Sequence, residues 1–335
     1  MQRLNALPIF IVLLLWAGVA GLPAQIPALV SGEVQLIKAD DEKFQDFEVP
    51  KLDSLDQLIF ELEGGDGGWV EYAYYDRFNT LRTQRVGGGE GATVSAGFRI
   101  GNGSGDIPRG AILRLIIGKR GEWAKHDLLD TGNYGAGGGG GTTVLMSKDN
   151  RQSWTVLLVA SGGGGAGVQK TEKGIFDSPG LPGNPTDNGT GSGMQQNIAS
   201  GGSQGQGGQF VQSSGGGGGA FGDGIHEPGA LYYGNAGWKD KMLYKEPLGG
   251  VGGTQAGARN GGWGFGGGGS GGVSGGGGGG YSGGGAGKAG FGGGGGGSFI
   301  ESISVSPFNA SRQNNGSTIN PGDGYVRYML TKKSP

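Results

Sequence analysis

Short apolar segments, separated by clusters of Gly, Asp, Asn and Pro, occupy much of the chain. Several alternate apolar with polar residues, and others are continuous runs of β-branched and aromatic residues. None reaches the roughly ten residues expected of a helix. The pattern therefore predicts β-strands at residues 33–37, 44–49, 57–62, 69–75, 93–100, 112–117, 142–146, 154–159, 298–305 and 324–330.

Glycine dominates the region between the early and the late strands. The chain holds 85 Gly among 335 residues, and 64 of them lie between residues 131 and 297. Average usage is roughly 7%. Collagen is excluded, because Gly does not recur at every third residue and Pro totals only 13. By composition alone this region would be a flexible linker, which is the first alternative.

Three features favour a packed structure over a linker. Large aromatic residues interrupt the glycine, strand-like sequence resumes after it, and pure glycine runs directly adjoin expected strands. The longest runs are 137–141, 162–165, 215–219, 266–269, 275–280 and 292–297. Such runs can form extended left-handed helices with about three residues per turn, which have no internal hydrogen bonds. Packed side by side without Cβ atoms, they can bond to one another, so we predict a bundle of polyglycine II helices.

The predicted organisation has four parts. Residues 1–24 combine Arg3, an apolar stretch and small residues, which is typical of a secretory signal peptide cleaved after Ala20 or Ala24. We therefore expect a secreted or cell-surface protein. Residues 25–134 are expected to form an antiparallel β-sandwich, 135–297 a glycine-rich insertion whose segment 142–161 returns strands to the sandwich, and 298–335 the closing strands. Sequons occur at Asn102, Asn188, Asn309 and Asn315.

Charge and composition exclude several kinds of chemistry. The 26 basic and 28 acidic residues give a net charge of -2, so nothing indicates nucleic-acid binding. Cysteine is absent, and the two histidines, His126 and His226, lie far apart in the sequence. The glycine loops at 101–106 and 283–289 lack phosphate-binding spacing. The Asp-Gly elements at 65–67, 222–224 and 322–324 are expected to be turns, and calcium binding is the alternative. We predict no catalytic residue, cofactor or metal site, and hence no enzyme.

Two polar segments between glycine runs are candidates for partner binding. Residues 168–212 are rich in Pro, Ser, Gln and Asn, and residues 225–248 hold four aromatic residues among adaptable polar ones, which is typical of recognition surfaces. The alternative is that these aromatic residues simply cover the bundle. The candidate residues are Tyr232, Tyr233, Trp238 and Tyr244.

The chain resembles the glycine-rich domain of the anaplastic lymphoma kinase and leukocyte tyrosine kinase receptors. The similarity rests on the hydrophobic strand that enters glycine at 154–167, the glycine and aromatic run 261–284, and the closing segments 292–300 and 322–326. Upstream, 47–50 and 58–68 are similar to the opening strand and first glycine turn of that family, so the resemblance spans about 44–330. It implies a tumour-necrosis-factor-like (TNF-like) sandwich with an inserted glycine-helix bundle that binds extracellular protein ligands.

Departures from that family limit what the resemblance implies. The kinase signatures are absent, so no kinase activity is expected. A second similarity, to glycine-rich tips of phage tail adhesins, is opposed by the signal peptide. Three functions stay open: a secreted recognition or adhesion module that binds an extracellular protein or surface glycan, a matrix protein that self-associates through glycine helices, and a ligand-binding protein related to receptor ectodomains. A homo-oligomer is compatible with each.

Overall fold

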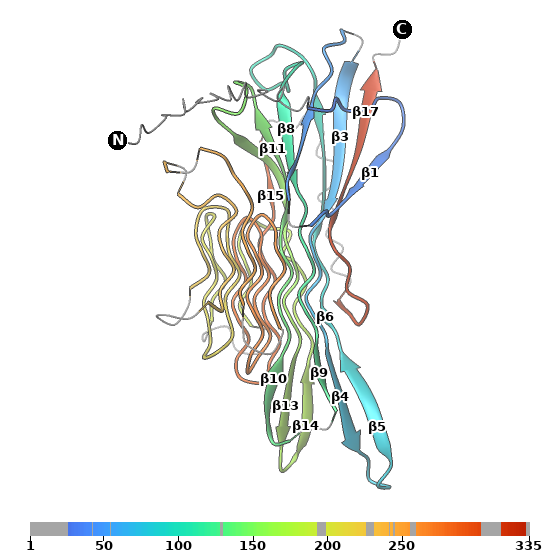
Figure 1. The fold of residues 1–335 in the computed structure, drawn as a ribbon, viewed down its shortest axis with the longest axis vertical. Coiled ribbons are helices and arrows are strands. Elements are labelled where there is room, and N and C mark those ends of the chain that lie inside the picture. The colour runs from blue at the N-terminus through green and yellow to red at the C-terminus, as the bar shows by residue number, and fades with distance from the viewer. Residues whose placement is uncertain are drawn as a thin grey trace, which may run out of the picture.

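The chain forms an elongated all-β molecule. The computed structural model describes residues 26–41, 43–53, 55–127, 130–192, 199–225, 231–240, 242–243, 245–254, 259–302 and 316–332. These residues form strands and extended segments without a helix, which confirms the all-β part of the expected fold. Figure 1 shows groups of strands at the two ends and wavy, extended segments between them. The predicted signal peptide lies outside the described residues.

Two antiparallel sheets form a sandwich-like domain at one end. The four-stranded sheet has the order β1-β17-β3-β7, and the five-stranded sheet has the order β15-β12-β11-β8-β2. The first comprises β1 (Gln35–Lys38), β17 (Tyr325–Lys332), β3 (Leu55–Glu63) and β7 (Thr93–Arg99). The second comprises β15 (Phe299–Ile300), β12 (Thr155–Ala160), β11 (Thr142–Ser147), β8 (Ile112–Ile116) and β2 (Gln45–Glu48).

Hydrophobic alternation holds these two sheets together. Along β3 the side chains of Leu58, Phe60 and Leu62 are fully buried, and the residues between them are more exposed. Leu113 and Leu115 of β8 belong to the same core from the opposite sheet. Burying a side chain of this size stabilises the fold by about 1.5–3 kcal/mol. A slip of one residue would turn the apolar set outward, so this core fixes the strand register.

Two smaller sheets form the opposite end, which we call the distal tip (Figure 1). One has the order β5-β4-β9, with β4 and β9 parallel, and the other has the antiparallel order β10-β13-β14. A two-stranded ribbon of β6 (Gly88–Gly89) and β16 (Ser317–Thr318) is separate from both. The tip strands are β4 (Val70–Tyr75), β5 (Leu81–Val86), β9 (Ala124–His126), β10 (Gly132–Gly135), β13 (Gly167–Thr171) and β14 (Gly174–Ser178).

The distal tip corrects one expectation. The strand predicted at 69–75 exists as β4, but it lies in the tip and not in the sandwich. Its apolar residues, among them Val70 and Tyr72, pack against Ala166 and Val168 in a separate small core. Alternation indicates a half-buried strand, but it does not indicate which of two cores buries it.

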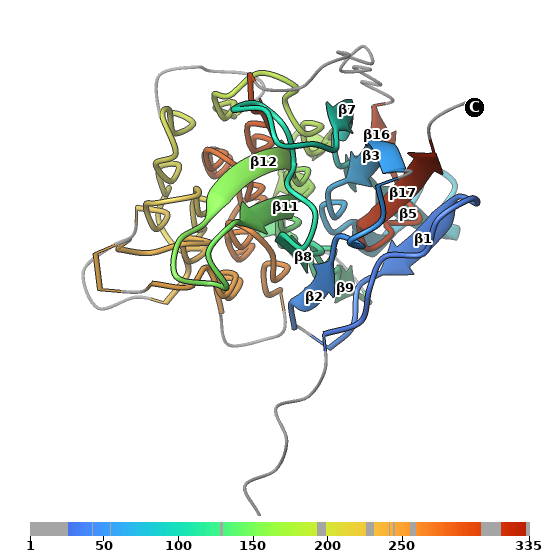
Figure 2. The same cartoon turned by 90° about the horizontal axis from the view of Figure 1, so that it is seen from above.

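Extended glycine segments connect the two ends and repeat every three residues. The successive amides of residues 275–280 donate in rotation to segments 291–294, 136–139 and 215–218, with N···O distances of 2.8–3.2 Å. The fourth amide returns to the first neighbour, and the cycle repeats. Seen from above, the segments of the block turn in small triangular coils (Figure 2). A strand would instead alternate between two neighbours.

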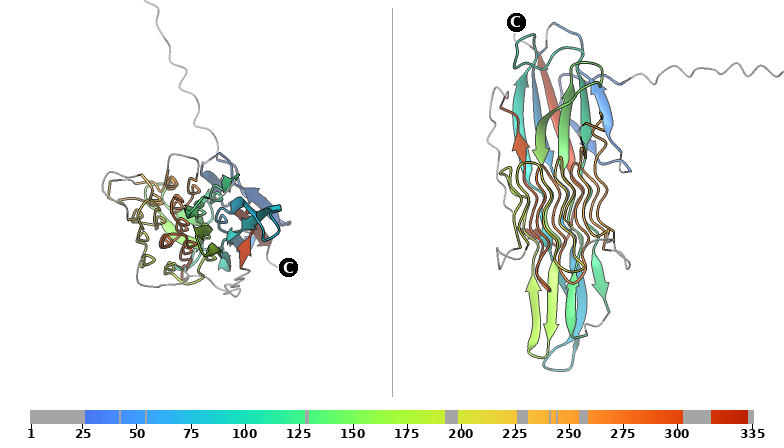
Figure 3. Two further views of the ribbon diagram at one scale, coloured as in Figure 1. Left: turned by 90° about the horizontal axis from the view of Figure 1, so that it is seen from below. Right: turned by 90° about the vertical axis from the view of Figure 1, so that its left-hand side faces the viewer.

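The acceptors of the same segment complete its surroundings. The carbonyl groups of residues 275–279 accept hydrogen bonds from segments 284–287 and 162–165 and from Gly269. Together with the three segments to which it donates, this makes six neighbours around one extended backbone. The segments run side by side between the two ends (Figure 3). The block is therefore held by hydrogen bonds that run across it in all directions, and we call it the glycine bundle.

Close packing explains why the interior runs are pure glycine. A Cβ atom placed on any residue from 276 to 279 would lie closer than 3.0 Å to a carbonyl oxygen of another segment. Real Cβ atoms essentially never come so close. The bundle interior thus has no room for the smallest side chain.

At the rim of the bundle, by contrast, every third residue carries a side chain. Leu248, Val251 and Thr254 are exposed, and the glycines between them are buried or half-buried. The same spacing occurs at Gln206 and Gln209, which are also exposed and enclose the buried Gly207 and Gly208. Since the backbone repeats every three residues, a Gly-Gly-X pattern leaves one line of side chains facing the solvent and two glycine faces against the bundle.

The bundle begins earlier in the chain than residue 135. The amides of Gly64 and Gly67 bond to Ala92 and Gly89, and those of Gly65 and Gly68 bond to residues 140 and 137, with the same repeat of three. The chain therefore crosses the bundle on leaving β3 and again on returning from the tip. The predicted boundary between a sandwich at 25–134 and an insertion at 135–297 does not describe this path.

Candidate functional site

The structure places the four predicted recognition aromatics differently. Tyr232 and Tyr233 are half-buried on the bundle. Trp238 is only 7% exposed and packs with Trp263 and Phe265 against the outer face of the five-stranded sheet. This corrects the expectation that a loop holds Trp238 out, and it matches the alternative that aromatics cover the bundle. Tyr244 lies outside the described residues.

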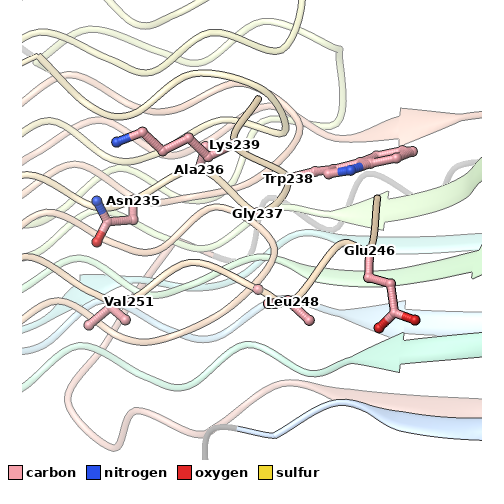
Figure 4. A pocket seen from close by; sticks show the side chains of 9 residues that line it. Asn235, Ala236, Gly237, Trp238, Lys239, Glu246, Leu248 and Val251 are labelled. Carbon is pink, nitrogen blue, oxygen red and sulfur yellow. The ribbon is translucent and has the colours of Figure 1, made fainter. Parts of the chain in front are cut away.

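A shallow pocket lies beside Trp238 (Figure 4). Its volume is about 190 Å³, and Asn235, Lys239, Glu246, Leu248 and Val251 contribute to its lining. The Lys239 ammonium contacts the carboxylate of Asp223, whose other oxygen accepts the amide of Ala236 at 2.8 Å. The charged groups near this pocket are therefore already engaged within the protein.

A buried arginine fixes one wall of that pocket. Arg114 of β8 is almost completely buried and donates to both carboxylate oxygens of Asp46, at 2.8 and 3.0 Å. It also donates to the carbonyl of Pro247 at 3.0 Å, next to Glu246. Its guanidinium carbon lies 3.6 Å from the ring centre of Phe44. Through its ion pair, hydrogen bonds and ring contact, the Arg114 side chain links the five-stranded sheet to the 245–248 loop.

The two hairpins of the distal tip carry four exposed apolar side chains. Tyr75 is 57% exposed, Phe78 72%, Leu81 56% and Phe176 53%. They belong to the β4–β5 and β13–β14 hairpins, at the end of the molecule opposite the C-terminal strand β17 (Figure 1). Exposed apolar residues that gather in one place indicate an interaction surface more strongly than scattered ones do.

A cleft lies between those two hairpins. Its volume is about 760 Å³, and residues of β4, β5, β13 and β14 line it, among them Tyr72, Tyr74, Tyr75 and Ile175. This volume falls within the roughly 300–1,000 Å³ that is typical of small-ligand sites. We call it the tip cleft.

Hydrogen bonds tie the two hairpins together at this cleft. The Tyr72 hydroxyl donates to Asp177 Oδ1 at 2.9 Å, and the Gln84 amide donates to Asp177 Oδ2. Burial of the Tyr72 ring and, next, its hydrogen bond to Asp177 raise the pKa of that hydroxyl above its ordinary value. Tyr72 therefore stays a neutral donor, and the three side chains form a fixed polar element of the cleft.

The other motifs singled out in the sequence have structural partners. Asp66 accepts amides of Gly91 and Gly322 at 2.7 and 2.8 Å, and Asp323 accepts the amide of Arg120 at 2.9 Å. Among the described residues no group of three or more metal-ligating side chains gathers. The expectation that these elements are turns is wrong for residues 65–67, which lie within an extended bundle segment; the Asp66 side chain instead links that segment to residues 91 and 322.

The histidines, the acidic residue Glu61 of β3 and the sequons are placed as follows. His126 ends β9 with its ring centre 4.3 Å from that of Tyr134, and burial lowers its pKa. Glu61 accepts hydrogen bonds from Tyr325 and Arg327 across the sheet. Of the sequons, Asn102 and Asn188 are exposed. The remaining candidates, His226, Asn309 and Asn315, lie outside the described residues.

Sequence reasoning found only one side of the tip cleft. The candidate segment 168–212 contains the lining residues of β13 and β14, which are strands and not the expected loop, and the β4–β5 side was missed. The available signal was the aromatic run 72–78, which ends in an Asp-x-x-Asn turn at 76–79. Asp76 accepts the amides of Phe78 and Thr80, both at 2.9 Å, which closes that turn. A strand that alternated around a single core would not need aromatic residues on both faces, so this run indicated an exposed hairpin.

Two comparisons with known proteins found no match. No family model matches the chain, and no curated protein is significantly similar to it. Among the described residues, no helix long and apolar enough to cross a membrane was found.

Proposed function

We propose that this protein is a secreted or cell-surface recognition and adhesion module, without catalytic activity, that contacts its target through the distal tip. The observation that carries the proposal is that the exposed apolar side chains of Tyr75, Phe78, Leu81 and Phe176 all lie on the two hairpins of the distal tip, at the far end from β17. A contact surface at the far end of an elongated molecule can reach a target that lies at a distance from the sandwich end. The signal-peptide pattern at residues 1–24 supports export.

In this proposal the bundle is a stiff spacer of polyglycine II helices. Support comes from the rotation of hydrogen bonds among three neighbours along 275–280. A helix of this type has about three residues per turn and a rise of about 3.1 Å, so six residues span about 19 Å. Bonding to six neighbours prevents such helices from bending independently, so the tip is held at a constant distance from the sandwich.

We further propose that the sandwich has a TNF-like architecture. The support is the resemblance to the receptor glycine-rich domain, together with two facing antiparallel sheets in which β1 pairs with β17 near the other end of the sequence. A ligand-binding protein related to those receptors is compatible with the same surface.

The matrix alternative requires bundles of different molecules to join. At the rim, Leu248, Val251 and Thr254 place side chains at the positions where a further glycine segment would have to approach. This observation favours a closed bundle and a recognition role over self-association.

The test uses particles coated with the mature chain through its C-terminal end. Binding is measured to intact cells, matrix proteins and oligosaccharide-coated plates. We compare a tip variant, Phe78→Ala with Leu81→Ala and Phe176→Ala, with a side variant, Leu231→Ala with Leu248→Ala and Val251→Ala. All six residues are about half exposed or more, so neither set disturbs a core.

We expect the tip variant to lose binding at least about tenfold and the side variant to keep it. Loss in the side variant alone would overturn the tip assignment and support the 225–248 segment. Reversible growth of molecular mass with concentration, without binding to any surface, would support the matrix alternative instead.

A further inference from the structure

The tip cleft combines aromatic and hydrogen-bonding groups at close range. Tyr72 and Tyr74 lie on one strand with ring centres 5.8 Å apart, and Tyr74 is half-buried in the cleft wall. Gln84 and Thr171 line the same cleft from β5 and β13. A ligand that fits must therefore present an apolar face and an edge of polar groups together.

The Asp177 carboxylate has capacity left for a ligand. It offers about four lone-pair sites, of which Tyr72 and Gln84 use two. Its side chain is exposed, because Asp177 lies in β14 at the edge of its sheet. The hydrogen bonds from Tyr72 and Gln84 hold the carboxylate in one orientation, which favours acceptance of directed hydroxyl donors.

Charge at the cleft is balanced. Three basic and three acidic side chains line it, so a polyanion such as a sulfated chain or a nucleic acid finds no net attraction. The six are Asp76, Arg77, Lys170, Glu172, Lys173 and Asp177. Asp76 is in addition paired with Arg82 at 3.0 Å. This balance favours a neutral, polar ligand.

We propose that the tip cleft binds a neutral saccharide unit of a surface glycan, with the sugar ring against Tyr74 and its hydroxyl groups on Asp177 and Gln84. A pyranose has an apolar C–H face and a rim of hydroxyl groups, which is the combination that this cleft complements. A tyrosine supplies both a flat apolar surface and a polar end. The inference rests on the proposed recognition function and names its ligand class.

The experiment probes the mature chain on an array of immobilised oligosaccharides. One set ends in neutral hexoses or N-acetylhexosamines, and a matched set carries sulfate or sialic acid. Variants are Tyr74→Ala, Tyr74→Phe and Asp177→Asn, with Tyr325→Ala on β17 as the control for a half-buried tyrosine at the opposite end of the molecule. Because Tyr74→Ala removes a packed ring, Tyr75→Ala serves as a second tip variant at a more exposed position.

We expect binding to at least one neutral terminus. Tyr74→Ala and Asp177→Asn should each weaken it about tenfold, which corresponds to about 1.4 kcal/mol, while Tyr74→Phe and Tyr325→Ala stay within about threefold. Binding confined to sulfated or sialylated chains, or neutral binding that none of the tip variants changes, would overturn the inference.

A further outcome separates this inference from the recognition function itself. If coated particles adhere through the tip, the array stays blank, and protease treatment of the target surface abolishes adhesion, then the ligand is a protein and the saccharide inference is wrong. In that case the recognition function stands. If the particles adhere to nothing and the array is blank, both proposals fail.

Discussion

A single added methyl group inside the glycine bundle should destabilise the whole molecule. In Gly277→Ala the new Cβ would meet the carbonyl oxygen of Gly284 at well under 3.0 Å, with the amide nitrogen of Gly217 at 2.9 Å. Both partners are backbone atoms, so no side chain can rotate away. The segment must shift, and the bonds from Gly277 N to Gly215 O (3.0 Å) and from Gly269 N to Gly277 O (2.8 Å) shift with it.

The expected change in the free energy of unfolding combines two destabilising terms and one stabilising term. Overpacking costs about 1–3 kcal/mol. Weakening two backbone hydrogen bonds adds about 1–3 kcal/mol. The lower entropy of the unfolded alanine chain returns about 0.4–1 kcal/mol. We expect a net loss of about 1–5.6 kcal/mol, which is a sizeable part of the 5–15 kcal/mol stability typical of a domain.

The assay is urea denaturation of the mature chain followed by tryptophan fluorescence, because Trp238 and Trp263 pack where the bundle meets the sheet. The matched control is Gly322→Ala, where the nearest atom to the added Cβ is an Asp66 carboxylate oxygen at 3.8 Å. The control should change stability by less than about 1 kcal/mol. Equal, small effects of the two substitutions would refute the packed bundle.

Three further predictions concern other parts of the molecule. Arg114→Met should lower the free energy of unfolding in urea titrations by about 3–5 kcal/mol, because the buried Asp46 carboxylate keeps only Arg151 as an ion-pair partner. As a control, Arg82→Met breaks an exposed ion pair and should cost less than about 1 kcal/mol. Burial and, next, repulsion from Asp66 raise the pKa of Glu63 in the folded state. The stabilising contribution of protonated Glu63 is therefore fully present below the ordinary carboxyl pKa and is lost as pH rises through the folded-state pKa. Glu63→Gln should reduce the change of melting temperature between about pH 4 and 7, and an unchanged pH dependence would contradict this cause. Amides of 275–280 should resist hydrogen exchange for hours while the amide of Arg77, in the exposed β4–β5 turn, exchanges rapidly. Free exchange at 275–280 would indicate a linker.

Several elements were predictable because their signals are local. The alternation at 57–62 and 324–330 appears as β3 and β17, since a half-buried strand must alternate whatever it pairs with. The bundle interior was predictable in a similar way, because only glycine fits among close backbones, as the Cβ positions at 276–279 demonstrate. The Gly-Gly-X spacing at 248–254 also marks the rim once a three-residue repeat is assumed.

The candidate binding site was not predictable in this way. Trp238 was expected at a recognition surface and lies in a core, while Tyr74 and Asp177, about a hundred residues apart, meet at one cleft. Burial of Trp238 depends on the outer face of the five-stranded sheet, which belongs to a distant part of the chain. The aromatic content of a loop does not reveal which apolar surface lies beside it.

The sequence alone therefore determines the all-β class, the positions of most strands and the need for glycine to pack against glycine. Tertiary structure decides that the strands divide between a sandwich and a distal tip, and that hairpins β4–β5 and β13–β14 enclose a cleft. The physical reason lies in the glycine segments themselves. They carry no side chains that could select a partner, so the order in which they pack is imposed by the sheets at their two ends.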